Sequence, residues 1–134
     1  MDKLSKKERS ELMSRIRVSG TDIEEKLNEL VRYFWRTERY RKNVKKLPGK
    51  PDIVFSKSKI AIFADGDFWH GRNFKKWKNK IPKFWIEKIT KNIERDIRQT
   101  KKLKKMGFKV LRFWGTDIKK NSKIVLKKIK NKLF

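Results

Sequence analysis

The stretch of the chain richest in potential chemistry is FADGDFWHGR, residues 63–72, which contains the only histidine, His70. Within it, Asp65 follows an apolar segment typical of a strand, and Asp52 begins the strand before it. A hairpin places the start of its first strand beside the end of its second, so we expect Asp52, Asp65 and His70 to lie together. Carboxylates bind hard cations such as Mg²⁺, and a nearby histidine can take a proton from water. The pattern predicts metal-assisted phosphodiester hydrolysis, although alone Asp52 reads as a turn cap and His70 as a structural histidine.

Two further acids could join this site. Asp96 lies four residues after Asn92 and shares its face of a predicted helix, beside a stripe of isoleucines. A polar group next to a core face needs a partner, which His70 or a metal-bound water would provide. An ion pair with a neighbouring Arg or Lys is the alternative for Asp96. Glu24 stands three residues after Thr21, which is the spacing of a helix capping box, and its functional reading requires a side chain that reaches toward the hairpin.

Three apolar side chains near these acids allow two interpretations. Phe68 and Trp69 precede His70, and Met13 lies in an otherwise polar N-terminal segment. Burial in a core is the commoner role for such residues. On a protein that binds DNA, they could instead insert between base steps and unstack them. We expect Phe68 and Trp69 to point out of the loop that follows the strand.

The composition favours a polyanionic partner. The chain carries 40 Lys and Arg against 15 Asp and Glu, a net charge of +25, which indicates nucleic acid, with an anionic membrane surface as the lesser alternative. Five Trp and nine Phe argue against a disordered basic tail. The absence of cysteine, of a signal peptide and of a membrane-spanning apolar run predicts a cytoplasmic protein of a reducing compartment that does not enter membranes.

Periodicity predicts a single α/β domain over residues 1–134, with a central mixed β-sheet flanked by helices. A DNA-contacting helix is expected within residues 1–20, and an amphipathic basic helix within residues 115–134, beginning at Asp117. The other expected elements, in chain order, are a core-packed helix from Thr21, an extended segment at 40–44, a loop at 45–52, a β-hairpin over 52–64, an exposed loop at 73–82, a helix at 83–105 ended by Gly107, and a strand at 108–114.

Several blocks together resemble one family. The motifs GKPDIVF, FADGDFWHG, FWIEKITKNIERD and GFKVLRFW, with RSELMSRIR and GTDIEEKL before them, are similar to the very-short-patch-repair (Vsr) endonucleases over about residues 9–114. The resemblance implies a restriction-endonuclease-like core. It also implies Mg²⁺-dependent nicking of double-stranded DNA on the 5′ side of the thymine in a T:G mismatch.

The resemblance also implies roles for individual residues. Asp52 matches the metal-binding aspartate of the family, and Ala64 falls where the family supplies a backbone carbonyl to the metal. His70 matches the catalytic histidine, Asp96 its carboxylate partner, and Glu24 a further active-site acid. These five positions, together with Asp65, which falls near the scissile phosphate in the family, form the predicted catalytic and metal-binding set.

Other positions match residues that contact the DNA. Asp65 falls at a position near the scissile phosphate, and Met13, Phe68 and Trp69 match the residues that intercalate beside the mismatch. The family commonly holds a structural zinc with cysteines and histidine, but this chain has no cysteine and Asp67 stands where one would be expected. We therefore expect no zinc, and a loop held by packing alone, with Trp77, Trp85 and Trp114 as candidates.

Three functions remain open at this point. The first is mismatch-dependent nicking by a monomer of the prokaryotic nucleoid, followed by repair factors that process the nick. The second is a sequence-specific or mobile-element (homing-type) nicking endonuclease of the same family that needs no mismatch. The third is a non-catalytic DNA-binding module, which the acids argue against because each would repel phosphate.

Overall fold

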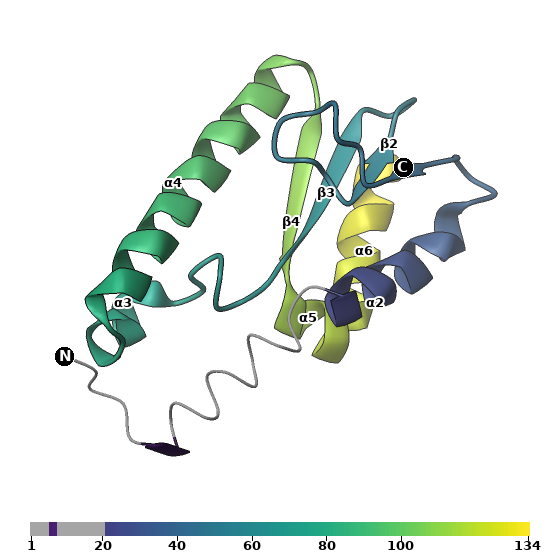
Figure 1. Cartoon of the computed structure of the whole chain (residues 1–134). Coiled ribbons are helices and arrows are strands. Elements are labelled where there is room, and N and C mark those ends of the chain that lie inside the picture. The colour runs from purple at the N-terminus through teal and green to yellow at the C-terminus, as the bar shows by residue number, and fades with distance from the viewer. Residues whose placement is uncertain (1–5, 8–20) are drawn as a thin grey trace.

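The computed structural model describes residues 6–7 and 21–134 of the chain (Figure 1). Lys6 and Lys7 are helical, while the rest of the helix expected in residues 1–20, including Met13, lies outside the described residues. The helices and strands that follow are α2 (Thr21–Val31), η1 (Arg32–Phe34), β1 (Arg41–Lys42), β2 (Ile53–Phe55), β3 (Ile60–Asp65), α3 (Phe74–Trp77), η2 (Lys78–Lys80), α4 (Lys83–Lys105), β4 (Lys109–Trp114), α5 (Gly115–Lys120) and α6 (Ser122–Leu133).

The four strands form one mixed sheet in the order β1-β2-β3-β4. The first three pair antiparallel, and β3 pairs parallel with β4 along its whole length. The predicted hairpin and the central position of β3 are therefore confirmed. Helix α4 lies on one side of the sheet, and α2 and α6 lie on the other (Figure 1), as the predicted fold class requires.

Alternation along β3 decides which side chains face α4. Ile60 and Ile62 pack with residues of α2 and α6 in the larger core cluster. The residues between them turn the other way, where Ala61 and Phe63 pack with Leu103 of α4. Because strand side chains alternate between faces, Asp65 at the end of β3 also points to the α4 side.

The end of α4 is set by Gly107, as predicted. Its φ is +92°, a left-handed conformation that glycine adopts without strain. The Phe108 N–H donates back to the Leu103 carbonyl at 3.0 Å, which closes the last turn of the helix and starts β4 beside β3. A tight turn therefore connects the end of α4 to the sheet.

Two predictions about local structure are wrong. Residues 73–82 are mostly exposed, as predicted, but they are not an irregular loop: they contain α3 and η2, and Ile81 is buried with Phe68 and Ile89. The apolar residues hidden among its lysines recur at helical spacing, and their burial overrides the polar composition. The C-terminal helix is divided into α5 and α6 at Asn121, whose side chain donates to Asp117 Oδ1 at 3.0 Å. In the part of the chain that the structure describes, no helix is long and apolar enough to cross a membrane.

Candidate active site

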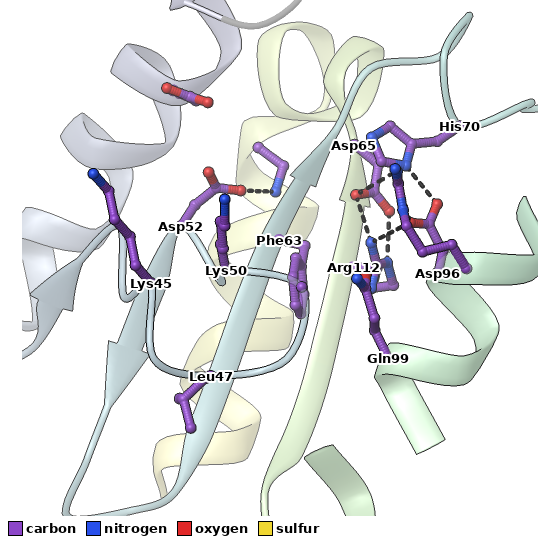
Figure 2. Close-up of a pocket in the computed structure, with 14 residues that line it drawn as sticks. Lys45, Leu47, Lys50, Asp52, Phe63, Asp65, His70, Asp96, Gln99 and Arg112 are labelled. Atoms are coloured by element: carbon purple, nitrogen blue, oxygen red, sulfur yellow. Dashed lines mark hydrogen bonds and ion pairs between the residues drawn. The ribbon is translucent and has the colours of Figure 1, made fainter. Parts of the chain in front are cut away.

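A cavity of about 460 Å³ opens between the β1–β2 loop, the end of β3 and α4. All six positions predicted for catalysis or metal binding line it, namely Glu24, Asp52, Ala64, Asp65, His70 and Asp96. Figure 2 shows Asp52 on one side of β3, with Asp65, His70 and Asp96 gathered on the other. The structure thus brings together residues from four separate segments, while their catalytic roles remain predictions.

Asp52 is placed by the β2–β3 pairing. Its N–H donates to the Ile62 carbonyl at 3.0 Å, and its Oδ2 accepts from the Ala64 N–H at 2.7 Å. Burial raises the pKa of Asp52 from 3.8 to about 6, and the negative charges of Glu24 and Asp65 act in the same direction. The Ala64 N–H and Arg112 oppose this rise in pKa only in part. The cost of ionising Asp52 in this buried position is therefore only partly offset by hydrogen bonding and positive charge.

These donors suit a hard cation better than a soft one. Within residues 6–7 and 21–134, no three His, Asp or Glu side chains are arranged to hold a metal by themselves. Mg²⁺ does not need such a cage, because it is commonly bound by one or two carboxylates together with water and substrate phosphate. Asp52, the exposed Glu24 and the Ala64 carbonyl would supply the protein's share of oxygens.

His70 and Asp96 form a hydrogen-bonded pair, with 2.5 Å between Nδ1 and Oδ2. Burial raises the pKa of Asp96, but the hydrogen bond and charge of His70, with Arg112 and Arg95, more than offset burial and hold it below its usual value. An ionised carboxylate can only accept, so Nδ1 is the donor. The other ring nitrogen, Nε2, is left to accept a proton.

The turn after the histidine fixes this pair. Gly71 has a φ of +71°, and a Cβ there would lie 2.6 Å from Ile93 Cδ1 on α4. Only glycine lets the loop approach the helix so closely. Asn92 of α4 also donates to the Trp69 carbonyl at 3.0 Å. The predicted link between the Asn92–Asp96 face and His70 is therefore present in the structure.

Sequence reasoning missed Arg112 of β4. Its Nε donates to Asp65 Oδ2 at 2.8 Å and its Nη2 to Asp65 Oδ1 at 3.1 Å. Asp65, predicted to lie near the scissile phosphate, is thus 6 % exposed and already engaged by a guanidinium. A single Arg at an alternating position of an apolar strand is the signal that could have pointed to it.

The cavity also has cationic walls that the sequence analysis did not identify. Lys45 and Lys50 of the β1–β2 loop and Arg95 of α4 line it. Lys50 has a φ of +52° directly before Pro51, a conformation that is strained for a non-glycine residue. The hydrogen bonds that hold the loop include those from the Lys50 N–H to the Leu47 carbonyl and from the Val44 N–H to the Pro51 carbonyl. The backbone that carries Lys45 and Lys50 is therefore held in place, and lysine and arginine side chains suit the phosphates of a nucleic acid.

The expectation that Phe68 points outward is wrong. Its side chain is 6 % exposed and packs with Ile81 and Ile89. Trp77 stacks on it with ring centroids 5.5 Å apart. Trp69 is half-buried and is the more accessible of the pair. Intercalation by either residue stays a prediction, and for Phe68 it would require the ring to leave this cluster.

The expectation that packing alone holds this loop is also wrong. Asp67 accepts from the Thr116 N–H at 3.0 Å and from the Thr116 hydroxyl at 2.7 Å, which ties the loop to the start of α5. Arg72 lies 3.4 Å from both Asp67 and Asp117. The aromatic residues do contribute, because Trp77 and Trp85 pack in the same cluster as Phe68. Polar and aromatic contacts together therefore fix the segment that carries His70.

Comparison with known proteins identifies similar sequences over most of the chain. A family described as DNA mismatch endonuclease Vsr matches residues 1–76. "Type II nicking enzyme V.NmeDIP" of Neisseria meningitidis serogroup C is 40% identical over 134 residues, covering 97% of this chain and 88% of that protein. "Type II nicking enzyme V.HpaIIP" of Haemophilus parainfluenzae is 41% identical over 90% of this chain and 87% of its own length. "DNA mismatch endonuclease Vsr" of Escherichia coli (strain K12) is 34% identical over 87% of this chain and 74% of its own length.

Proposed function

The chain belongs to the Vsr family of DNA endonucleases, and we propose that it cuts one strand of duplex DNA at a defined sequence. The observation that carries this proposal is the single cavity that gathers Asp52, Glu24 and the His70–Asp96 pair. A binding module has no use for carboxylates on the surface that meets DNA. The nicking enzymes of Neisseria and Haemophilus, each about two-fifths identical, support strand nicking as the reaction.

The charge of the chain supplies the affinity for DNA. A net charge of +25 attracts the phosphate backbone without regard to sequence. Within the cavity, Lys45, Lys50 and Arg95 offer cations for phosphates next to the one that is cut. We thus assign DNA binding and strand cutting to different residues of the same cavity.

The chemistry assigned to the residues follows from the two carboxylates. Asp96 holds the Nδ1–H of His70, so His70 can take a proton from the attacking water at Nε2. Asp52, with Glu24 and the Ala64 carbonyl, would hold a divalent cation, for which we propose Mg²⁺. When bound, this cation would neutralise charge on the phosphate and on the departing oxygen. Asp52 and Asp96 keep distinct tasks because their surroundings push their pKa values in opposite directions.

A second candidate is nicking on the 5′ side of the thymine in a T:G mismatch. The similarity to the Escherichia coli mismatch endonuclease favours it. The partly accessible Trp69, beside the cavity, could act on a poorly stacked base pair. Repair proteins that process the nick would then be its functional partners.

A nicking assay separates these candidates. Supercoiled plasmid is incubated with Mg²⁺ or with EDTA, and nick sites are mapped by sequencing. The mapped site is then placed in end-labelled duplexes that differ only in a T:A or T:G pair, at moderate salt to suppress non-specific binding. We expect Mg²⁺-dependent nicks at one sequence, lost in Asp52→Asn and His70→Ala and kept in Asp22→Asn, an exposed acid of α2.

The outcome is read from the two duplexes. Equal cutting of the T:A and T:G duplexes supports a sequence-specific nicking enzyme. Cutting of the T:G duplex alone supports the mismatch candidate. Cutting that survives in Asp52→Asn and His70→Ala, or the absence of cutting with every divalent metal, contradicts the assignment of this cavity as the active site.

A further inference from the structure

Asp65 has an unusual environment. Among the described residues it is the one charged side chain that is buried, at 6 % exposure, and it lies at the end of the central strand β3. Asp52 and Asp96 line the same cavity, so other carboxylates lie near it. A buried carboxylate among other acids is costly unless a cation is bonded to it.

Arg112 provides that cation and uses its whole guanidinium to do so. It donates to both oxygens of Asp65, at 2.8 and 3.1 Å, and to Thr100 Oγ1 of α4 at 3.1 Å. It also lies 3.4 Å from Asp96 Oδ1 and 4.0 Å from the ring centroid of Phe63. One side chain of β4 therefore joins the end of β3 to α4.

These contacts determine where His70 can bond. The imidazole Nδ1 lies 2.5 Å from Asp96 Oδ2 and 3.7 Å from Asp65 Oδ1, so two carboxylates flank it. Arg112 engages both oxygens of Asp65 and the far oxygen of Asp96 (Figure 2). Without Arg112, Asp65 would be free to compete with Asp96 for the ring.

We propose that Arg112 is a positioning residue, which keeps Asp65 occupied and Asp96 fixed so that Nε2 of His70 faces the cavity. This inference deepens the proposed function and rests on it. Asp65 then acts as the counterion of Arg112 and does not touch the DNA. The geometry calls for arginine in particular, because a lysine ammonium cannot bond both oxygens of one carboxylate and a second carboxylate in a fixed plane.

The test uses a double-mutant cycle on the full chain. The variants are Arg112→Gln, Asp65→Asn and both together, with Arg112→Lys as the conservative change. Lys109→Gln, which removes an exposed cation from the same strand, is the matched control. Three quantities are measured: the single-turnover nicking rate, the Kd for DNA in EDTA, and the NMR resonances of the imidazole, which are unambiguous because the chain has one histidine.

We expect Arg112→Gln to lower the nicking rate about 10- to 100-fold, the loss that a displaced catalytic group typically causes, with the Kd for DNA unchanged. Arg112→Lys restores only part of the rate. The double variant recovers at least about tenfold over Arg112→Gln, because the unpaired Asp65 charge is gone. The His70 resonances shift and broaden in Arg112→Gln and return in the double variant, while Lys109→Gln matches the wild type.

Other outcomes overturn the inference. A rate that stays intact while the Kd rises would make Arg112 a DNA contact. A double variant no faster than Arg112→Gln, with unmoved His70 resonances, would remove the positioning role. If the wild type does not nick DNA, the proposed function fails, and the His70 resonances still decide whether Arg112 orders the histidine. If Arg112→Gln does not fold, Arg112→Lys carries the same comparison, since it keeps the charge and loses only the planar donors.

Discussion

Replacing Asp52 with asparagine should stabilise the protein at neutral pH in the absence of divalent metal. Burial, aided by Glu24 and Asp65, raises the pKa of Asp52 from 3.8 to about 6. The folded protein therefore binds the Asp52 proton more tightly than the unfolded chain does. The stability of the folded protein must fall as the pH rises from 3.8 to about 6. Above that range the folded state bears the whole free-energy cost of ionising Asp52. Asparagine removes the cost and keeps an oxygen that can accept from the Ala64 N–H.

The size of the effect follows from the pKa. Each tenfold change in proton affinity corresponds to about 1.4 kcal/mol, so ionising Asp52 costs the folded state about 3 kcal/mol before solvent screening. Partial exposure of the carboxyl reduces this, and we expect Asp52→Asn to raise the free energy of unfolding by about 2 kcal/mol at about pH 7.5. Near pH 4 the difference between the two proteins should almost vanish.

Urea denaturation in EDTA at these two pH values measures the effect. Asp22→Asn serves as the control, because its side chain is exposed and its contact with Lys119 is a surface ion pair worth little. Addition of Mg²⁺ should then stabilise the wild type and leave Asp52→Asn unchanged. A variant that is equally or less stable than the wild type at neutral pH would refute the argument that Asp52 lacks compensating charge.

The remaining predictions concern the loop, its anchor and the DNA. Gly71→Ala should lower the free energy of unfolding, measured in urea, by about 2–3 kcal/mol, and by more than Gly107→Ala. Both glycines have a positive φ, so alanine strains the backbone at either position. The new methyl at Gly71 would also lie 2.6 Å from Ile93, whereas the one at Gly107 would meet only the flexible end of Lys59. Asp67→Ala should cost about 1–2 kcal/mol by the same measurement, through its lost hydrogen bonds with Thr116, and a change below that of Asp22→Ala would contradict this. Asp52→Asn should bind DNA more tightly than the wild type in EDTA, since it removes a charge that repels phosphate, and an unchanged or weaker Kd at fixed salt would count against a DNA-facing Asp52.

Much of the scaffold could be predicted from local patterns. The apolar run of β3 and the isoleucine spacing of α4 each report a single element, so their type and limits follow from the residues within them. The placement of Asp52 and Asp65 at one cavity was predictable because a hairpin constrains its own register. For the α4 side of the cavity, the sequence predicted which residues lie there but not the contacts between them.

What sequence reasoning missed depends on contacts between distant segments. Arg112 meets Asp65 because β4 pairs parallel with β3 in one register, and a shift of one residue would turn Arg112 to the opposite face. The bond between Asp67 and Thr116 depends on that register as well. Phe68 was predicted to lie at the surface because the loop that carries it was expected there. In the structure, residues of the neighbouring α3 and η2 segment cover the Phe68 side chain. These features belong to the tertiary arrangement, which a local pattern alone does not specify.

The two carboxylates at the centre of the cavity show why attraction to DNA and cutting of DNA are separable in this molecule. Asp52 has too little positive charge around it and Asp96 has more than enough, although both line one cavity. The +25 charge of the chain draws DNA to the surface with or without a bound cation. A phosphate that approaches an ionised Asp52 is repelled, whereas Asp96 is already balanced and holds His70 regardless. A divalent cation is therefore required at one carboxylate only, and its absence should stop cutting without preventing DNA binding.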